Sequence, residues 1–235
     1  MSKVIVTTGG TRGIGLAILE RFATAGFDLI FCARNERDGL AVKSDFQKRF
    51  PAARVYFKPA DLSDKEQANE FAHFVKEVAP TVDVLVNNAG TFIPGSILEE
   101  EEGALEKMIA SNLFSAYYLT RAIGKDMKAK RSGHIFNICS TASITPYVNG
   151  GSYGISKFAL LGMTKTLREE LKTHNVKVTA VLPGATDTAS WEGSGLPEER
   201  FMKPEDVAES VYSAWSLSER AVVEEILIRP QLGDI

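Results

Sequence analysis

Short apolar runs alternate along the whole chain with longer stretches in which apolar residues recur every three or four positions. The first such stretch carries Ile14, Ile18 and Phe22 on one face, which is typical of an amphipathic helix. Runs predicted as strands begin at Lys3, Asp28, Arg54, Val82, His134, Val176 and Val223. Stretches predicted as helices are residues 13–26, 36–50, 64–79, 99–111, 113–130, 152–173 and 204–217.

Strand-like runs that are almost entirely apolar and separated by helices predict a parallel sheet with both faces covered. Because crossovers between parallel strands are right-handed, the sheet is expected to be doubly wound. No linker, repeat or low-complexity segment interrupts the alternation. We therefore predict an α/β fold: a single-domain, Rossmann-type doubly wound parallel sheet of about seven strands spanning residues 1–235.

Local patterns add three expectations about helix starts and loops. Ser63 is placed to cap the helix predicted at 64–79. Ser96 and Glu99 have the spacing of a capping box, which makes Glu99 to Glu102 the acidic first turn of a helix, with no function assigned. Residues 185–203 are the longest stretch without periodicity, and a segment of this length in a compact domain predicts a substrate lid.

The composition narrows the classes of function. A net charge of -3 over 235 residues gives no electrostatic footprint for nucleic acid, and no apolar run is long enough to cross a membrane. The N-terminal run lacks the longer apolar region of a signal peptide. Cys32 and Cys139 lie inside apolar segments, as expected for reduced thiols in the cytoplasm. The three histidines lack metal-ligand spacing, so we expect no metal site.

A glycine-rich turn, "TTGGTRGIG", joins the first predicted strand to the first helix. Gly9, Gly13 and Gly15 have a spacing related to the dinucleotide fingerprint, with one extra residue. Such glycines allow a tight turn and a close approach of the backbone to a pyrophosphate at a helix N-terminus. Glycines also mark ordinary turns, but this position between strand and helix favours nucleotide binding.

The end of the second strand indicates which nucleotide. An NAD site places an acid there to accept a hydrogen bond from the ribose 2′-hydroxyl, whereas this chain has Ala33 followed by Arg34. Arg12, in the glycine-rich turn, is placed to reach the same point. Two guanidinium groups without a carboxylate suit a 2′-phosphate, so we predict NADP(H). The alternative is that both arginines are simply solvated.

Two more segments follow predicted strands at the edge where open α/β sheets bind ligands. Asp61 and Leu62 follow the third strand and are placed to contact adenine. The segment "NNAG", residues 87–90, follows the fourth strand and is placed beneath the cofactor. The alternative for its two asparagines is local capping of the backbone.

Tyr153 and Lys157 lie four residues apart, on one side of a helix and near its start. A neighbouring ammonium favours the phenolate, which would lower the pKa of Tyr153 and suit it to proton transfer. Ser140 ends the preceding strand, where its hydroxyl is placed to hold a substrate oxygen beside the phenol. The alternative is a helix boundary whose lysine extends into water, and the nearby serine and glycine-rich turn argue against it.

Taken together, these segments resemble the short-chain dehydrogenase/reductase family from Thr8 to about Ile228. The resemblance is carried by "TGGTRGIG", "DL" at 61–62, "NNAG", Asn112, Ser140, "YGISK" and "PGATDT" at 183–188. It implies a catalytic tetrad of Asn112, Ser140, Tyr153 and Lys157. Tyr153 is then the proton donor to the carbonyl oxygen, and Ser140 orients that oxygen. Lys157 binds the nicotinamide ribose and tunes Tyr153, while Asn112 holds a water of the proton relay.

The resemblance also implies the residues that contact NADP(H), with Pro183, Gly184 and Thr188 seating the nicotinamide carboxamide. The expected cofactor contacts are Gly9, Thr11, Arg12, Gly13, Ile14, Gly15, Arg34, Asp61, Leu62, Asn88, Ala89, Gly90, Tyr153, Lys157, Pro183, Gly184 and Thr188. The chain departs from the family where Cys139 replaces the first of two serines and where the last strand lacks a Gly-Gly turn. The ending is similar to compact carbonyl-reductase and sepiapterin-reductase-like members.

The implied activity is NADP(H)-dependent reduction of a ketone or aldehyde to an alcohol. Reduction of a 3-oxoacyl thioester is an alternative, but the lid offers no basic patch for an acidic carrier protein, since Glu192, Glu198 and Glu199 oppose Arg200 and Lys203. A catalytically silent NADP-sensing protein is a remote alternative. Phe92, Tyr147, Val148 and Trp191 are candidates for the substrate pocket or for plain packing. Family members usually pair through helices such as 113–130 and 152–173, so we expect a homodimer or homotetramer.

Overall fold

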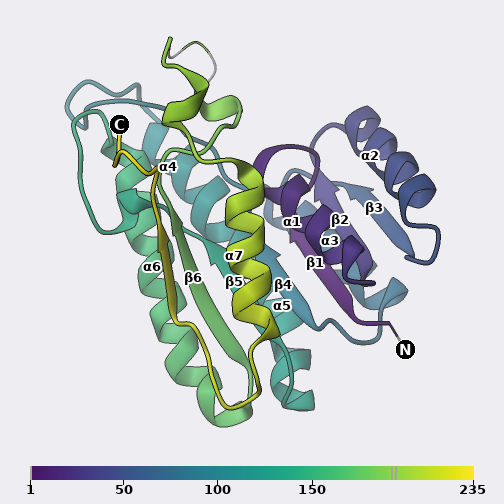
Figure 1. Ribbon diagram of the computed structural model, residues 1–235. Coiled ribbons are helices and arrows are strands. Elements are labelled where there is room, and N and C mark those ends of the chain that lie inside the picture. Colours follow the sequence, from purple (N-terminus) through teal and green to yellow (C-terminus); the bar gives the residue numbers. More distant parts are fainter. Residues whose placement is uncertain (1, 192, 194) are drawn as a thin grey trace.

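The computed structural model describes residues 2–191, 193 and 195–235, and its centre is one sheet of seven parallel strands (Figure 1). The strand order is β3-β2-β1-β4-β5-β6-β7, which confirms the predicted doubly wound sheet. The strands are β1 (Val4–Thr8), β2 (Asp28–Ala33), β3 (Val55–Pro59), β4 (Val84–Asn87), β5 (His134–Ile138), β6 (Lys177–Pro183) and β7 (Glu225–Ile228). The order reverses between β1 and β4, so the ligand crevice of such a fold is expected above the carboxyl ends of these strands.

Helices cover both faces of the sheet because successive strand side chains point to opposite sides. On β1, Ile5 belongs to the core under α1 (Gly13–Thr24), α2 (Glu36–Arg49) and α7 (Pro204–Ser216). Its neighbour Val6 belongs to the core under α3 (Lys65–Val78), α5 (Ser115–Lys130) and α6 (Gly151–Leu171). Both residues are fully buried, which explains why the strands are apolar without alternation.

The predicted helices at 99–111 and 113–130 are one continuous helical stretch that begins later. It consists of α4 (Ala104–Ile109), a π-helical turn η1 (Ala110–Phe114) and α5. The stretch 99–102 lies before it, so the expected capping box of Ser96 and Glu99 is wrong. Gly103, whose left-handed backbone has a φ of 86°, immediately precedes α4 instead. A π-helical turn inside a helix often marks a functional position, and η1 contains Asn112.

The start of α3 also differs from the prediction. Asp64, not Ser63, caps this helix: its side chain accepts hydrogen bonds from the backbone N–H groups of Glu66 and Gln67. The Ser63 backbone N–H and hydroxyl donate instead to Asp61 Oδ1, at 3.0 and 2.7 Å. The short turn after β3 therefore occupies one oxygen of the Asp61 carboxylate.

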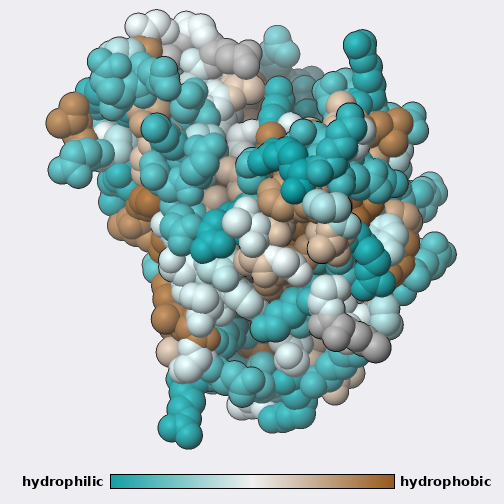
Figure 2. Space-filling model, turned by 45° about the vertical axis from the view of Figure 1, so that its right-hand side comes forward, coloured by the Kyte–Doolittle hydropathy of each residue, from teal (hydrophilic) through white to brown (hydrophobic). Residues whose placement is uncertain are grey.

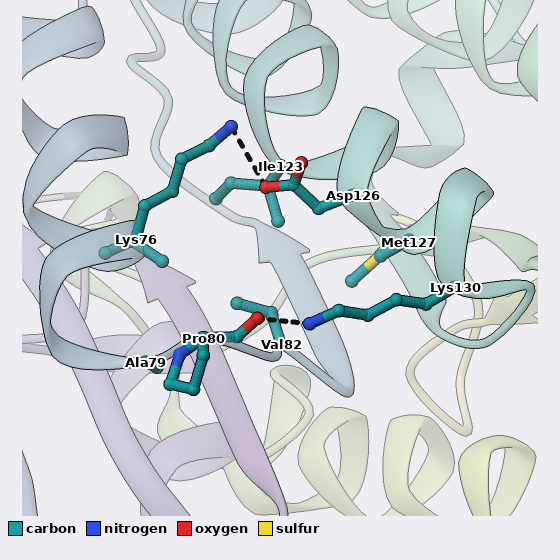
Figure 3. Close-up of a pocket in the computed structure, with 9 residues that line it drawn as sticks. Lys76, Ala79, Pro80, Val82, Ile123, Asp126, Met127 and Lys130 are labelled. Carbon is teal, nitrogen blue, oxygen red and sulfur yellow. Dashed lines mark hydrogen bonds and ion pairs between the residues drawn. The ribbon is translucent and has the colours of Figure 1, made fainter.

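At the amino ends of the strands, the space between α3 and α5 is too small for a ligand. A cavity of about 10 Å³ lies there, lined by residues that include Ala79, Pro80 and Val82. This is space for about one water molecule. Lys76 and Asp126 form an ion pair across it at 2.9 Å, and Lys130 donates to the carbonyl oxygen of Pro80 (Figure 3). The functional site is expected instead at the carboxyl ends of β1 and β4, where the strand order reverses.

The face of the molecule drawn in Figure 2 mixes hydrophilic and hydrophobic residues. On the side drawn in Figure 2, hydrophilic residues predominate and hydrophobic ones form small separate patches. Within the described part of the chain, none of the helices has both the length and the apolarity that a membrane span requires. Among the same residues, no group of three or more His, Cys, Asp or Glu side chains is arranged to hold a metal ion.

A buried histidine at the start of β5 predicts a stability that falls in mild acid. His134 lies against Phe136, with the ring centroids 3.9 Å apart, and burial lowers the pKa of His134 from 6.5 to about 3. Its Nε2 is 2.7 Å from the Thr179 hydroxyl, which donates its own hydrogen to the Val223 carbonyl oxygen. Nε2 therefore donates a hydrogen bond to Thr179. The other ring nitrogen, Nδ1, is the one that can take up a proton, and it is buried away from water.

Because the unfolded chain binds a proton near pH 6.5 and the folded chain does not, stability falls as the pH drops below that value. Between pH 7 and pH 5, we expect His134 to cost about 2 kcal/mol of unfolding free energy. Urea unfolding at the two pH values measures this loss. His134→Leu should reduce the loss, whereas His73→Gln, at an exposed position of α3, should leave it unchanged. Equal pH dependence in wild type and His134→Leu would contradict the prediction.

Candidate active site

The turn between β1 and α1 forms a cradle that only glycines can build. Gly9 and Gly13 have left-handed backbones, with φ of 66° and 53°. A Cβ on Gly15 would lie 2.3 Å from the Gly9 carbonyl oxygen, and a Cβ on Gly13 would lie 3.0 Å from Thr188 Cγ2. The loop after β6 thus closes against the first turn of α1. These contacts bring two of the predicted cofactor segments together at a helix N-terminus, where an anion is favoured.

Thr8, the last residue of β1, and Asn88, directly after β4, hold this cradle against the neighbouring strand. The Thr8 hydroxyl accepts from the backbone N–H groups of Asn88 and Ala89, at 2.9 and 2.8 Å. Asn88 Nδ2 donates to the carbonyl oxygens of Thr8 and Gly9, at 2.8 and 3.2 Å. The sequence did not single out Thr8 as a site residue, because nothing local marks its contacts across to β4. Asn88 therefore acts on the shape of the glycine-rich turn.

The other asparagine of the pair, Asn87, is part of a buried network and not a local backbone cap. Its Nδ2 donates to Thr120 Oγ1 at 2.9 Å and to Asn137 Oδ1 at 2.8 Å. Asn137 donates in turn to Thr164 on α6, at 2.8 Å. This chain of hydrogen bonds joins β4 and β5 to α5 and α6. It fixes the two strands whose ends carry the site against the helix that carries Tyr153.

The end of β2 has the features predicted from the sequence. Ala33 is buried where an acid would stand in an NAD site, and Arg34 and Arg12 are both exposed. The Gly10 backbone N–H donates to the Cys32 carbonyl oxygen at 3.1 Å, so the glycine-rich turn lies beside the end of β2. Leu62, after β3, is buried, while Asp61 is half-buried. Arg12, in the glycine-rich turn, and Arg34, directly after β2, are therefore both accessible to a ligand.

Tyr153 and Lys157 both come from the first two turns of α6, as the spacing predicted. Lys157 is 6% exposed, and its Nζ donates to the Ile138 carbonyl oxygen at 2.8 Å. Nζ lies 5.7 Å from the centre of the Tyr153 ring. A lysine with its ammonium group buried is not a helix-boundary residue extending into water, so that alternative is excluded. Ser140, which follows β5, lies near enough to Tyr153 to affect the pKa of its phenol.

Burial governs the proton affinities of these groups. It raises the pKa of Tyr153, and the nearby Ser140 side chain opposes that rise only in part. The expectation that Lys157 lowers the pKa of the Tyr153 phenol is therefore wrong for the protein without a bound cofactor. Burial also lowers the pKa of Lys157 from 10.5 to about 8. The site thus holds a protonated phenol beside an ammonium that gives up its proton in mildly basic solution.

Asn112 lies in η1 and links the loop after β4 to α6. Its Oδ1 accepts from the Thr91 backbone N–H at 2.7 Å, and its Nδ2 donates to the Thr91 carbonyl oxygen at 3.0 Å. Nδ2 also donates to Ser156 Oγ at 2.9 Å, and Ser156 Oγ donates to the Tyr153 carbonyl oxygen at 2.7 Å. Ser156, which the sequence did not single out, connects two members of the predicted tetrad. The expected water on Asn112 stays a prediction.

Of the four candidate pocket residues, Phe92 is in ring contact with Tyr153. The Phe92 ring meets the Tyr153 ring edge-on, with centroids 4.8 Å apart. Burial, together with the nearby Tyr153, raises the pKa of Tyr147 to about 12. Val148 is 88% exposed and therefore contributes little to the wall of a substrate pocket.

Trp191 lies in the predicted lid, where its ring packs against the Phe201 ring with the centroids 5.3 Å apart.

The predicted lid is a loop whose two ends are tied together above the carboxyl ends of the strands (Figure 1). The Asp187 backbone N–H donates to the Met202 carbonyl oxygen at 2.8 Å, and the Met202 N–H donates to that of Ala185 at 3.0 Å. An open hollow of about 470 Å³ is lined by Asp187, Thr188, Ala189, Trp191, Gly193, Gly195, Leu196, Glu198 and Phe201. Glu192, one of the acidic residues counted in the predicted charge of the lid, lies outside the described residues.

The remaining expected cofactor contacts meet at the same edge. Pro183 ends β6, and the Gly184 backbone N–H donates to the Ile228 carbonyl oxygen at 2.8 Å. A Cβ on Gly90 would lie 3.0 Å from Asn112 Oδ1 and 3.7 Å from Lys157 Nζ. Gly90 therefore lies between the glycine-rich turn and the tetrad. Thr11 and Ile14 are half-buried residues at the start of α1.

Comparison with known proteins agrees with this geometry. Residues 3–198 match the family model described as short chain dehydrogenase. Sepiapterin reductase of Chlorobaculum tepidum is 32% identical over 241 residues, covering 100% of this chain and 99% of that protein. A metagenomic short-chain oxidoreductase in complex with NADP is 31% identical, with a TM-score of 0.85 and 97% of each chain covered. An alcohol dehydrogenase of Thermococcus sibiricus, complexed with 5-hydroxy-NADP, is 29% identical with a TM-score of 0.91, covering 98% of this chain and 97% of that one.

Proposed function

Since the chain belongs to the short-chain dehydrogenase family, we propose that it is an NADP(H)-dependent oxidoreductase that reduces a ketone or aldehyde to an alcohol. The observation that carries this proposal is the burial of Lys157, whose Nζ lies 5.7 Å from the centre of the Tyr153 ring, with Ser140 near enough to the phenol to affect its pKa. A buried ammonium beside a half-buried phenol is an environment that shifts the pKa values of both groups, as is common at functional sites. Their place at the carboxyl edge, next to the glycine-rich turn, suits a reaction on a bound dinucleotide.

The residues present fit NADP(H). The cradle of Gly9, Gly13 and Gly15 leaves backbone N–H groups at the start of α1 for a pyrophosphate. Arg12 and Arg34 are available for the 2′-phosphate, and Ala33 leaves no carboxylate to repel it. Two similar solved structures hold NADP or its 5-hydroxy derivative, which supports the same assignment for this chain.

In the proposed reaction, the bound reduced nicotinamide supplies a hydride to the carbonyl carbon. Tyr153 donates its phenolic proton to the carbonyl oxygen, so that the carbonyl becomes an alcohol. Ser140 holds that oxygen beside the phenol, and Lys157 would hold the nicotinamide ribose through its ammonium group. In the reverse direction the same phenolate accepts the proton of the alcohol. Burial, which raises the pKa of Tyr153, keeps the phenol protonated before the reduction begins.

The surroundings of Tyr153 favour a small carbonyl compound with an apolar substituent. Phe92 and Tyr147 offer aromatic surface next to the phenol. In the lid, Glu198 and Glu199 are exposed acids, which gives an acidic carrier protein no complementary surface. Reduction of a 3-oxoacyl group on such a carrier is therefore disfavoured, and the segment 185–203 is proposed to close over a smaller substrate.

The outer faces of α5 and α6 support the expected homo-oligomer. Phe114, Tyr117, Ile155 and Phe158 are each 42% to 46% exposed on η1, α5 and α6, where apolar side chains gain from being covered. Both cysteines are free and buried, which suits the reducing cytoplasm that the sequence predicts.

Cofactor preference tests the proposal together with its nucleotide. In a panel of ketones and aldehydes, we expect consumption of NADPH with a kcat/KM at least about tenfold above that for NADH, since each arginine–phosphate hydrogen bond is charge-assisted. Consumption of the reduced cofactor, followed by its ultraviolet absorbance, is the measurement. Arg34→Ala should reduce the preference, whereas Arg121→Ala, on α5, should not.

Three other outcomes would each contradict a part of the proposal. A preference for NADH would refute the assignment of Arg12 and Arg34. Turnover confined to 3-oxoacyl groups on a carrier protein would refute the small substrate. Tight NADPH binding without reduction of any carbonyl in the panel would identify a nucleotide-binding protein without turnover.

A further inference from the structure

The acidic stretch before α4 places one carboxylate on the first turn of α6. Glu100 Oε1 accepts from the Ser152 backbone N–H at 2.8 Å, and Glu100 Oε2 accepts from the Ser152 hydroxyl. Gly150, at the N-cap position of α6, has no side chain to satisfy these N–H groups. A residue 52 positions away in the sequence therefore caps the helix that carries Tyr153 and Lys157.

Glycines on both sides make room for this carboxylate. A Cβ on Gly151 would lie 2.0 Å from Glu100 Oε1, and a Cβ on Gly95 would lie 2.5 Å from Glu100 Cγ. The Gly95 backbone N–H donates to the Asn149 carbonyl oxygen at 3.0 Å, and Gly95 forms an isolated β-bridge with Gly150. The loop after β4 therefore lies directly against the start of α6, and neither glycine position accepts a side chain without displacing Glu100.

The same loop reaches the reacting group at two further points. Phe92 packs edge-on against the Tyr153 ring, and Thr91 is held at both its backbone N–H and its carbonyl oxygen by Asn112. Ser152, whose two donors Glu100 takes, directly precedes Tyr153 and is 3% exposed. The position of the phenol thus depends on a loop held at one end by Asn112 and at the other by Glu100.

We propose that Glu100 is a positioning residue for the reaction: by fixing Ser152 and the first turn of α6, it holds the Tyr153 phenol at the carbonyl oxygen. This role rests on the proposed function, because it needs Tyr153 to be the proton donor. Glu100 touches neither the cofactor cradle nor the arginines at the end of β2. Its loss should therefore affect the proton-transfer step and leave NADPH binding as it is.

Glu100→Gln is the sharpest test, since it keeps the shape of the side chain and removes its charge. We expect kcat for carbonyl reduction to fall by about 10- to 100-fold, because small displacements of a reacting group are costly, while the KM for NADPH stays within about twofold. Glu99→Gln, at the exposed neighbouring acid, is the matched control and should match wild type. Ser152→Ala keeps the backbone N–H and removes only the hydroxyl donor, so it should lower kcat less than Glu100→Gln does.

Hydrogen exchange of the NADPH complex provides a readout that needs no turnover. In Glu100→Gln, the amides at the start of α6 should exchange faster than in wild type, with the rest of the chain unchanged. Wild-type kcat and wild-type exchange in Glu100→Gln would overturn the positioning role, as would equal losses in kcat and in NADPH affinity. If Glu100→Gln does not fold, the same two readouts on Ser152→Ala decide the question. A wild-type protein that reduces no carbonyl would instead refute the proposed function, and the exchange result would still report on the contact.

Discussion

Tyr153→Phe is expected to lower kcat for carbonyl reduction by about 10²- to 10⁴-fold, the range by which a positioned general acid contributes. The substitution removes one hydroxyl and keeps the ring that packs against Phe92. Because burial already keeps the phenol protonated, the variant loses the proton donor without losing a charge. NADPH affinity, measured by quenching of protein fluorescence, should change little.

Tyr117→Phe is the control for this prediction. Tyr117 lies on α5 and is 42% exposed, so removal of its hydroxyl should leave kcat unchanged. If Tyr153→Phe retained wild-type kcat with the same substrate, another group would have to supply the proton. The assignment of Tyr153 as the acid would then be wrong.

Lys157→Met should separate activity from stability. Methionine fills a similar volume without a charge, and burial disfavours the Lys157 ammonium, as the lowered pKa of this group shows. We therefore expect an unchanged or higher midpoint of thermal unfolding. Activity should fall, with NADPH bound about 10- to 100-fold more weakly because a charged hydrogen-bond donor to the ribose is lost, and with a lower kcat as well.

The pH dependence gives an independent check on Lys157. Since burial lowers its pKa to about 8, the wild-type kcat/KM for NADPH should decline as the pH rises through that value and the ammonium loses its proton. This decline should be absent from the residual activity of Lys157→Met. Lys165→Met, on the same helix, removes only an exposed ion pair with Glu225, and it should keep both the activity and the decline.

The fold was predictable because it depends on patterns that are visible within short segments. Apolar runs such as the one that became β1 are buried on both faces, and that burial is why the runs lack polar residues. The spacing of Tyr153 and Lys157 placed both on one side of α6, and the glycine spacing marked the turn before α1. These inferences needed only the geometry of a helix and of a tight turn.

The site residues that could not be predicted from the sequence depend on contacts between segments that are far apart along the chain. Thr8, Ser156 and Glu100 each act through a partner on another element, and no local pattern distinguishes them from ordinary polar residues. The same reason explains the wrong start at 99–111, where the acidic residues suited a first turn. Glu100 instead caps the first turn of α6, and Gly103 has the left-handed backbone conformation that precedes α4.

The pKa of Tyr153 was mispredicted for a related reason. The sequence shows that an ammonium is near the phenol, but it does not show how deeply both are buried. In the structure the Lys157 ammonium donates to the Ile138 carbonyl oxygen, and burial of the phenol dominates its pKa. The bound cofactor adds positive charge only in its oxidised form, so the phenol is expected to be an acid in reduction and a base in oxidation.

A single-turnover experiment on the wild-type protein and Tyr153→Phe tests the central claim most directly. Each protein, in excess over NADPH, is mixed rapidly with a carbonyl substrate found in the panel, and the absorbance of the reduced nicotinamide is followed. The account predicts complete loss of absorbance in wild type, with one alcohol formed per NADPH. It predicts a trace slower by at least about 10²-fold in Tyr153→Phe, with NADPH bound equally well. Equal rates in the two proteins would contradict it.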